Sequence, residues 1–192
     1  IDRVPEEVTA PRVDGAGTTH PTWDPAIGML HQAFAAMETG KPYGLGAYFA
    51  YRHDPLTGMP DTDAVKQALD KLKLIVSIDV RYSETGWYSD VILPESTYLE
   101  RANILAQLNG PIPVFLMRDQ AIKPRFNSRP AWWIFKEILQ RMDLKEALNF
   151  ETIEELWNYQ LEGTGVTVAE IREKGFVSVS DELKLFPPEK LK

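Results

Sequence analysis

The 192-residue sequence contains no cysteine, and its three histidines, His20, His31 and His53, lie far apart along the chain. Without cysteine the chain has no disulfide, thiolate metal site, iron–sulfur ligation or cysteine nucleophile. Three scattered histidines do not favour a histidine-based metal site. No run approaches the roughly 20 apolar residues of a membrane-spanning helix. The chain starts at Ile1 without a signal-peptide pattern, so we expect a fragment or a processed product.

Basic residues are also few. The chain has 21 Lys and Arg against 28 Asp and Glu, which gives a net charge of −7. A nucleic-acid-binding domain usually carries a basic face, so this balance argues against a nucleic-acid partner. Any phosphate site would have to rely on backbone N–H groups and helix N-termini. Hydrophobic residues make up 44% of the chain, which suffices for one domain with a real core.

Proline and glycine divide the chain into a predicted arm, domain and linker. Residues 1–23 are rich in both and show little periodicity, which is typical of an extended arm or loop. Residues 24–184 carry alternating strand and helix patterns and are predicted to form one domain. Residues 185–192 contain Pro187-Pro188 and are interpreted as an exit linker. We find neither an internal repeat nor a low-complexity tract.

The element pattern predicts an α/β fold in three layers, with a mostly parallel sheet, flanking helices and a helical C-terminal part. Strand, helix, strand, loop and strand in this order imply right-handed βαβ crossovers. The predicted elements are a helix from Asp24-Pro25 to a cap at Gly40, strands over 43–51, 74–80, 90–94 and 113–117, a helix capped by Thr62, a polar loop over 83–89, a helix from Pro130, and two helices opened by the capping boxes Thr152-x-x-Glu155 and Thr167-x-x-Glu170.

Open parallel sheets bind ligands at the carboxyl ends of their strands, so the residues after each strand are the candidate site. Asp54 and Asp79 are carboxylates that can accept the two N–H donors of a guanine edge. Ser83 and Thr85, with Gly86, can offer hydroxyl and backbone N–H groups to a phosphate or ribose. The chain has no glycine-rich dinucleotide or P-loop fingerprint, so the residues alone predict only a nucleotide-like site.

Each of these residues also has a purely structural interpretation. Asp54 before Pro55 is a common turn element, Asp79 could cap a loop N–H, and Asp90 could be a turn or cap residue at the start of a strand. No catalytic residue is predicted, because the chain offers no nucleophile–base arrangement and no partner for Glu95 and Glu100 in acid–base work.

One long block is more specific than these patterns. It runs through 72–79 (LKLIVSID), 83–94 (SETGWYSDVILP) and 95–101 (ESTYLER), with YFAYRHDP at 48–55 upstream. This block resembles a signature of the dimethyl-sulfoxide-reductase superfamily of molybdenum and tungsten oxidoreductases. The stretch Gly40-Lys41-Pro42-Tyr43 and the variant YLER are most similar to the polysulfide, thiosulfate and tetrathionate reductase branch, with respiratory arsenate reductases as close relatives.

The resemblance implies a Rossmann-like domain that holds the guanosine end of one molybdopterin guanine dinucleotide. In the family, two such dinucleotides hold a molybdenum or tungsten atom. By position, the cofactor-binding residues would be Asp54, Asp79, Ser83 and Thr85, with Asp90 as a further candidate. The sequence departs from the common pattern at Asp54 in place of Asn, at Gly86 in place of Ala and at Ser89 in place of Ala.

The family's metal ligand and iron–sulfur cysteines have no counterpart here, so we expect no metal ligand and no bound cofactor in the isolated chain. The resemblance implies that the other domains of a catalytic subunit, an iron–sulfur electron-transfer subunit and a membrane anchor are its partners. It further implies a periplasmic location or the outer face of the membrane. The alternatives are a non-enzymatic α/β module that binds a nucleotide or protein, and a free-standing hydrolase or transferase, which the absence of any catalytic constellation disfavours.

Overall fold

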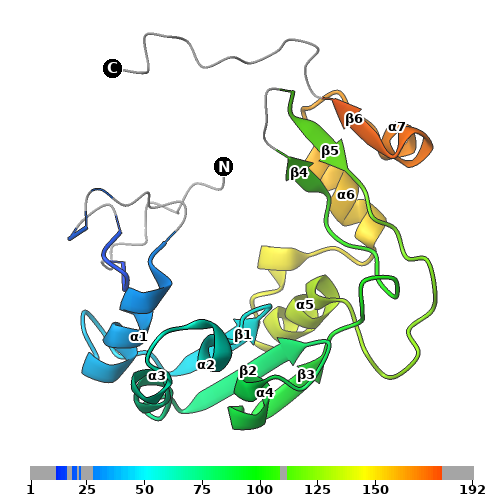
Figure 1. The fold of residues 1–192 in the computed structure, drawn as a ribbon. Helices are drawn as coiled ribbons and strands as arrows, with labels where there is room; N and C mark the ends of the chain where they lie inside the picture. Colours follow the sequence, from blue (N-terminus) through cyan, green and yellow to red (C-terminus); the bar gives the residue numbers. More distant parts are fainter. Residues whose placement is uncertain (1–11, 17–18, 21, 23–27, 109–111, 179–192) are drawn as a thin grey trace. The chain divides into compact units, whose positions relative to one another are not determined.

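The computed structural model describes residues 12–16, 19–20, 22, 28–108 and 112–178 (Figure 1). The predicted linker over 185–192 and most of the predicted arm over 1–23 lie outside the described residues. The chain divides into two compact units, Ile1–Pro94 and Glu95–Lys192, so the division falls inside the predicted domain 24–184. The two units are described in turn below.

The first unit is built on a three-stranded parallel sheet in the order β1 (Ala47–Tyr51), β2 (Leu74–Asp79), β3 (Val91–Pro94). The helices α2 (Pro55–Gly58) and α3 (Thr62–Leu69) connect β1 to β2, and α4 (Glu84–Tyr88) connects β2 to β3. The central strand β2 is buried from Ile75 to Ile78, as expected of a parallel strand that is covered on both faces. The predicted α/β class and the parallel pairing of these strands are confirmed.

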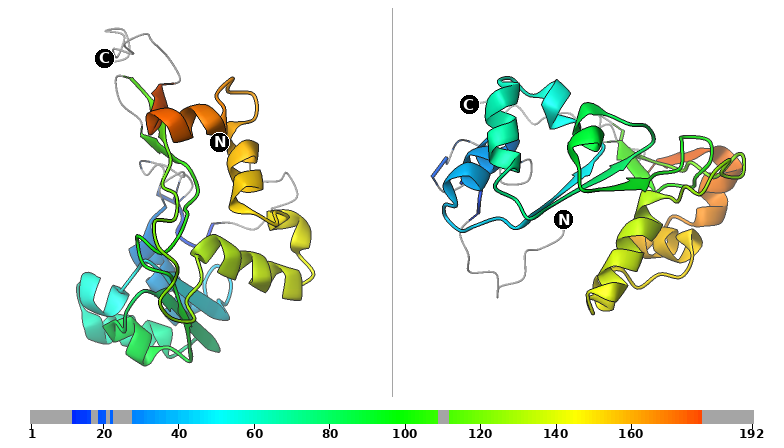
Figure 2. Two further views of the ribbon diagram at one scale, coloured as in Figure 1. Left: turned by 90° about the vertical axis from the view of Figure 1, so that its right-hand side faces the viewer. Right: turned by 90° about the horizontal axis from the view of Figure 1, so that it is seen from below.

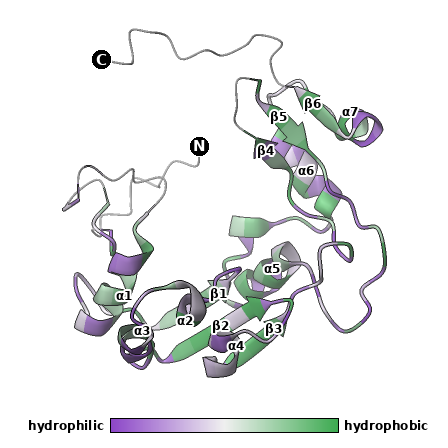
Figure 3. Ribbon diagram, viewed as in Figure 1, coloured by the Kyte–Doolittle hydropathy of each residue, from purple (hydrophilic) through white to green (hydrophobic). Residues whose placement is uncertain are grey.

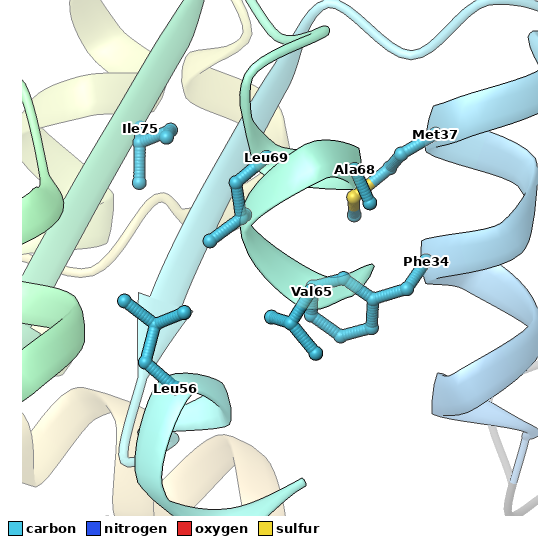
Figure 4. Close-up of a cluster of buried hydrophobic side chains, with 7 residues drawn as sticks. All are labelled: Phe34, Met37, Leu56, Val65, Ala68, Leu69 and Ile75. Atoms are coloured by element: carbon cyan, nitrogen blue, oxygen red, sulfur yellow. The ribbon is translucent and has the colours of Figure 1, made fainter. Parts of the chain in front are cut away.

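The core of this unit lies between one face of the sheet and the helices α1 (Leu30–Thr39), α2 and α3. Figures 1 and 2 show these helices on the same face of the sheet. Tyr48 of β1 points to this face and meets the ring of Phe34 edge-on, with the ring centroids 5.8 Å apart. The buried cluster, drawn in Figure 4, consists of Phe34, Met37, Leu56, Val65, Ala68, Leu69 and Ile75.

Several predicted element ends in the first unit are corrected by the structure. Helix α1 begins at Leu30, and Asp24-Pro25 lie outside the described residues, whereas the predicted cap at Gly40 is confirmed by its left-handed φ of 69°. Helix α3 is capped by Asp61, whose carboxylate accepts from the backbone N–H of Ala64 at 3.1 Å, so the prediction of Thr62 as its cap was wrong. The predicted polar loop over 83–89 contains the short helix α4.

The second unit contains an antiparallel sheet in the order β4 (Ala106–Leu108), β5 (Val114–Leu116), β6 (Phe176–Ser178). The strand predicted over 113–117 therefore exists as β5, but it does not extend the parallel sheet. Only a short connection separates β4 from β5 along the chain, and such a connection permits antiparallel pairing alone. The expectation of a mostly parallel sheet thus holds for the first unit only.

The second unit also contains the predicted C-terminal helices, α5 (Ala131–Arg141), α6 (Ile153–Leu161) and α7 (Val168–Lys174), with a 3-10 turn η1 (Lys145–Leu148). The capping box at Thr167 is complete, whereas Thr152 caps α6 while the Glu155 carboxylate accepts from Glu151 instead. The core consists of Ala102, Leu105, Trp157, Leu161, Val168 and Ile171.

The distribution of hydropathy follows this arrangement. Figure 3 shows β2, β3 and β5 largely in the hydrophobic colour and hydrophilic residues on α3 and α7. Among the described residues, no helix combines the length and apolar character that would let it cross a membrane.

Candidate functional site at the carboxyl edge of the parallel sheet

The carboxyl ends of the three parallel strands lie at one edge of the first unit, because Tyr51 pairs with Ile78 and Asp79 pairs with Pro94. A hollow of about 380 Å³ opens at this edge. Its lining residues come from the end of β2, the segment that follows it and strand β3: Asp79, Val80, Arg81, Tyr82, Ile92 and Pro94. This is the position at which open parallel sheets bind their ligands.

Asp79 presents its carboxylate at this hollow. One oxygen, Oδ1, accepts from the backbone N–H of Val80 at 2.6 Å and more weakly from that of Arg81 at 3.4 Å. Within the described residues Oδ2 accepts no hydrogen bond, and the side chain is partly exposed. Asp79 therefore combines the loop-capping role that its sequence position allows with an acceptor oxygen that is available to a ligand.

An exposed aromatic pair follows directly. The rings of Tyr82 and Trp87 stack with centroids 4.9 Å apart and planes 25° apart. Their side chains are 65% and 74% exposed, and Tyr82 lines the hollow. The sequence analysis missed this pair, because it interpreted residues 83–89 as a loop. The turn of helix α4 is what places the ring of Trp87 against that of Tyr82. Two aromatic residues in an otherwise polar segment were the signal that could have found it.

Asp54 and Thr85 form a partly buried connection between the segments after β1 and β2. The Oδ1 of Asp54 accepts from the backbone N–H of Thr85 at 3.0 Å and from its hydroxyl at 2.6 Å, while Oδ2 accepts from the hydroxyl of Thr57 at 2.8 Å. Burial raises the pKa of Asp54, but the hydrogen bonds from Thr85 and Thr57 outweigh it and the pKa is lowered overall. Thr85 is fully buried and its hydroxyl also accepts from the N–H of Leu56 at 3.3 Å.

Ser83 is the N-cap residue of α4. It is buried, and its hydroxyl oxygen accepts from the backbone N–H of Gly86 at 3.0 Å. The polar groups of Asp54, Ser83 and Thr85 thus satisfy one another or the neighbouring backbone. The structure brings these three residues together in the segments that follow β1 and β2, and β2 ends at Asp79. Their side chains hold the start of α4 in place.

Asp90 lies at the other edge of the sheet, before the first residue of β3. Its Oδ2 accepts from the backbone N–H of Ile75 at 2.7 Å, and its own N–H donates to the carbonyl of Ile75 at 3.0 Å. These bonds match the local capping role that the sequence allowed. The structure does not bring Asp90 to the edge at which Asp79 lies.

His53, the second residue after β1, forms a hydrogen bond with a neighbouring side chain. The hydroxyl of Tyr48 lies 2.5 Å from its Nδ1, and burial lowers the pKa of His53 despite the opposing charge of Asp54. Among the described residues, no three or more His, Asp or Glu side chains cluster so that they could hold a metal ion.

Comparison with known proteins identifies the family. The sequence model of the molybdopterin oxidoreductases matches residues 23–141. The chain is 31% identical over 165 residues to the thiosulfate reductase molybdopterin-containing subunit PhsA of Salmonella typhimurium, which covers 86% of this chain and 22% of that protein. It is 29% identical over 156 residues to acetylene hydratase of Syntrophotalea acetylenica, covering 81% of this chain and 21% of that protein.

The fold agrees with this match. The solved structure of acetylene hydratase from Pelobacter acetylenicus superimposes with a TM-score of 0.65 and 28% identity, over 81% of this chain and 21% of that one. The chain thus spans about a fifth of the length of these relatives. The family match extends from before α1 to the end of α5 and includes the whole carboxyl edge with Asp79, and we conclude that this chain belongs to the molybdopterin oxidoreductase family.

Proposed function

We propose that the carboxyl edge of the parallel sheet holds the guanosine end of a molybdopterin guanine dinucleotide. The observation that carries this proposal is the partly exposed carboxylate of Asp79 at a hollow beside Tyr82. Guanine offers two N–H donors on one edge, and a carboxylate accepts such a pair with both oxygens. Oδ2 of Asp79 is available to accept one of these N–H groups. Oδ1 would accept the other, either in place of its hydrogen bond from the backbone N–H of Val80 or in addition to it.

The other features of the edge support the fit. A volume of about 380 Å³ lies within the roughly 300–1,000 Å³ of ordinary small-molecule sites. The flat faces of Tyr82 and Trp87 offer a stacking surface for a purine or a ribose. In this proposal Asp79 touches the ligand, whereas Asp54, Ser83 and Thr85 act through the backbone that they hold in position. Asp90, at the opposite edge, is not part of the proposed contact set.

The bound cofactor would supply two-electron redox chemistry at its molybdenum or tungsten atom. This chain's own residues bind and orient one end of it. We therefore expect the isolated chain to be inactive and the reaction to require the rest of a catalytic subunit.

For the whole protein we propose the reductive cleavage of a sulfur–sulfur bond in thiosulfate or polysulfide. The similarity to the thiosulfate reductase subunit over 86% of this chain supports this substrate class. We propose further that an iron–sulfur subunit and a membrane anchor deliver the electrons, at the periplasmic or outer face. Thiosulfate-dependent oxidation of a reduced viologen by the intact enzyme tests the substrate, and hydration of acetylene without thiosulfate reduction would contradict it.

Titration with guanosine monophosphate tests the proposed site. We expect the 192-residue chain to bind it more tightly than adenosine monophosphate, since the adenine edge presents an acceptor where guanine presents N1–H. Asp79→Ala should weaken the guanosine complex by about tenfold, the equivalent of roughly 1.4 kcal/mol. Asp90→Ala removes a carboxylate at the opposite edge and is the matched control. Equal binding by Asp79→Ala and the unmutated chain would remove Asp79 from the site.

A further inference from the structure

A second surface with a distinct chemistry lies in the Glu95–Lys192 unit, and its argument is independent of the proposed cofactor role. It is formed by residues 95–103, between β3 and β4, and residues 118–129, between β5 and α5 (Figure 1). Neither segment contains a helix or a named strand. We call the two segments together the paired-loop surface.

Hydrogen bonds hold the two segments side by side along their length. Backbone N–H groups of Ala121 and Ile122 donate to the carbonyl of Leu99 at 2.9 and 3.1 Å. Further bonds join Asn103 to Arg118 at one end and Ser96 to Arg129 at the other, at 3.1 and 3.0 Å. Loops pinned in this way can present side chains in a fixed arrangement, which lowers the entropic cost of binding.

The carboxylates of the first segment are turned inward. Glu100 is buried, and its two oxygens accept from the backbone N–H and hydroxyl of Thr97 and from the backbone N–H of Arg125 at 2.7 to 3.0 Å. Glu95 is also buried and forms an ion pair with the buried Arg101. Both carboxylates therefore bond to groups of the chain itself and leave little negative charge on the surface.

The cationic groups, in contrast, reach the surface. Lys123, Arg125 and Arg129 are exposed and Arg118 is partly exposed. Within the described residues none of these four side chains forms an ion pair. The one exposed carboxylate of the two segments, Asp119, lies 3.5 Å from Arg172 of α7. A chain with a net charge of −7 thus carries a locally basic surface.

Aromatic rings orient these guanidinium groups. The Cζ of Arg118 lies 4.0 Å from the ring centroid of Tyr98, and that of Arg125 lies 5.6 Å from the ring of Phe126. A guanidinium that stacks on a ring keeps its N–H edge for a bidentate bond to a carboxylate. The Nε of Arg118 is buried and has no acceptor among the described residues.

Large apolar side chains lie among the cations. Tyr98, Leu99, Ile122 and Phe126 are 62%, 52%, 53% and 77% exposed. Arginine and aromatic residues are enriched at protein-binding surfaces, whose central part is apolar. A nucleic-acid surface would combine cations with stacking rings and would have no use for Leu99 and Ile122, and the negative charge of the whole chain would oppose a polyphosphate backbone.

We propose that the paired-loop surface binds an acidic polypeptide segment that also carries apolar side chains. Its carboxylates would pair with Arg118, Lys123, Arg125 and Arg129, and its apolar side chains would cover Leu99, Ile122 and Phe126. The sign of the charge on this surface is opposite to that of the chain, so the partner is selected and oriented by electrostatic complementarity.

Fluorescence anisotropy with a labelled synthetic peptide, rich in Glu with interspersed Leu and Phe, tests the proposal on the full 192-residue chain. We expect saturable binding that weakens as salt rises. Substitution of Gln for every Glu, or of Ser for every Leu and Phe, should each weaken the binding by about tenfold or more. Equal binding of the Gln peptide, or no binding of the Glu peptide, would overturn the proposal.

Variants of the chain locate the contact. Arg125→Gln and Phe126→Ser should each reduce peptide affinity by about tenfold, whereas Lys145→Gln, which removes an exposed cation of η1, should leave it unchanged. Far-ultraviolet circular dichroism of each variant verifies that the fold is retained. Equal losses in Lys145→Gln would show that binding follows net charge alone and would contradict the assignment.

Two competing occupants are distinguished in the same experiment. If labelled oligothymidylate binds more tightly than the Glu peptide, the surface is a nucleic-acid site and the proposal fails. If sedimentation velocity shows a dimer of the chain alone that Arg125→Gln and Phe126→Ser both dissociate, a second copy occupies the surface and the proposal also fails. A monomer at all concentrations, with peptide binding as described, supports it.

Discussion

At the scale of single residues, Asp54 and Asp79 show how surroundings assign different roles to one residue type. Asp54 follows β1 and Asp79 is the last residue of β2, so both lie at the carboxyl ends of parallel strands. The two oxygens of Asp54 accept three hydrogen bonds from Thr85 and Thr57, and this carboxylate therefore acts within the fold. Asp79 keeps one oxygen available at the hollow, so it is the aspartate suited to a ligand.

Removal of the Asp54 carboxylate should destabilise the chain. In Asp54→Ala the fully buried Thr85 loses the acceptor of its hydroxyl and its N–H, and we expect a loss of about 1–3 kcal/mol in the free energy of unfolding. Asp54→Asn should cost less, because the amide oxygen accepts from Thr85 and the amide nitrogen donates to Thr57. Urea unfolding measures both. Asp79→Ala, at a partly exposed site, is the control and should stay within about 0.5 kcal/mol.

The carboxylate of Asp54 also makes the free energy of unfolding depend on pH. The pKa of Asp54 is lower in the folded chain than in the unfolded chain, since its hydrogen bonds outweigh the effect of burial. Its stabilisation is therefore fully present above the unfolded value of about 4 and is lost as the pH falls through the lower folded value. We expect the free energy of unfolding to fall below about pH 4, and to fall less steeply in Asp54→Asn. An identical acid slope in both proteins would show that other groups control it.

At the scale of elements, short helices in this chain depend on side chains at their ends. Helix α4 has five residues, too few for stability by itself. The hydroxyl of Ser83 caps it, and the bond from Thr85 to Asp54 anchors its first turn to the segment after β1. The site edge is thus ordered by contacts across the fold, not by helix propensity.

Helix α7, with seven residues, offers the clearest test of this dependence. Thr167 accepts from the N–H of Glu170 at 3.2 Å and forms the complete capping box. We expect Thr167→Ala to lower the free energy of unfolding by about 0.5–2 kcal/mol, and Thr167→Ser to restore most of it. Denaturant unfolding of the three proteins provides the comparison. No difference between the Ala variant and the unmutated chain would mean that burial of Val168 and Ile171 alone determines the helix.

At the scale of the whole molecule, the chain has two hydrophobic clusters, one in each compact unit. Leu69 is fully buried in the first cluster and Ile171 in the second. Each unit therefore has its own source of stability from apolar burial. The family match ends at residue 141, inside the second unit, so it includes the first cluster and only part of the second.

A core substitution in one unit should accordingly act mainly within that unit. Leu69→Ala leaves a cavity and should cost about 2–5 kcal/mol. We expect amide hydrogen exchange to show lost protection in β1, β2 and α3, while β4, β5 and β6 keep theirs. Ile171→Ala, the matched substitution in the other cluster, should give the reverse pattern. Equal loss of protection in both units would show that they unfold as one cooperative body.

Local patterns predicted a large part of this molecule. The runs over 74–80 and 90–94 predicted β2 and β3, which the structure places at Leu74–Asp79 and Val91–Pro94, because buried parallel strands need continuous β-branched and aliphatic residues. Capping chemistry predicted the starts of α6 and α7, since an N-cap depends on residues only three positions apart. It failed at α3, where Asp61 and Thr62 are both suitable caps and the chain path selects the first.

The sequence by itself determined that the strands β1, β2 and β3 run parallel, and it determined the candidate edge and the family, because these follow from short-range patterns and from one contiguous block. The tertiary structure alone decided which aspartate stays available. Asp54 meets Thr85 across 31 residues, Asp90 binds Ile75 at the opposite edge, and the turn of α4 brings Trp87 onto Tyr82. Hydrogen-bond partners distant along the chain are selected by the packing of whole elements, and no local pattern specifies that packing.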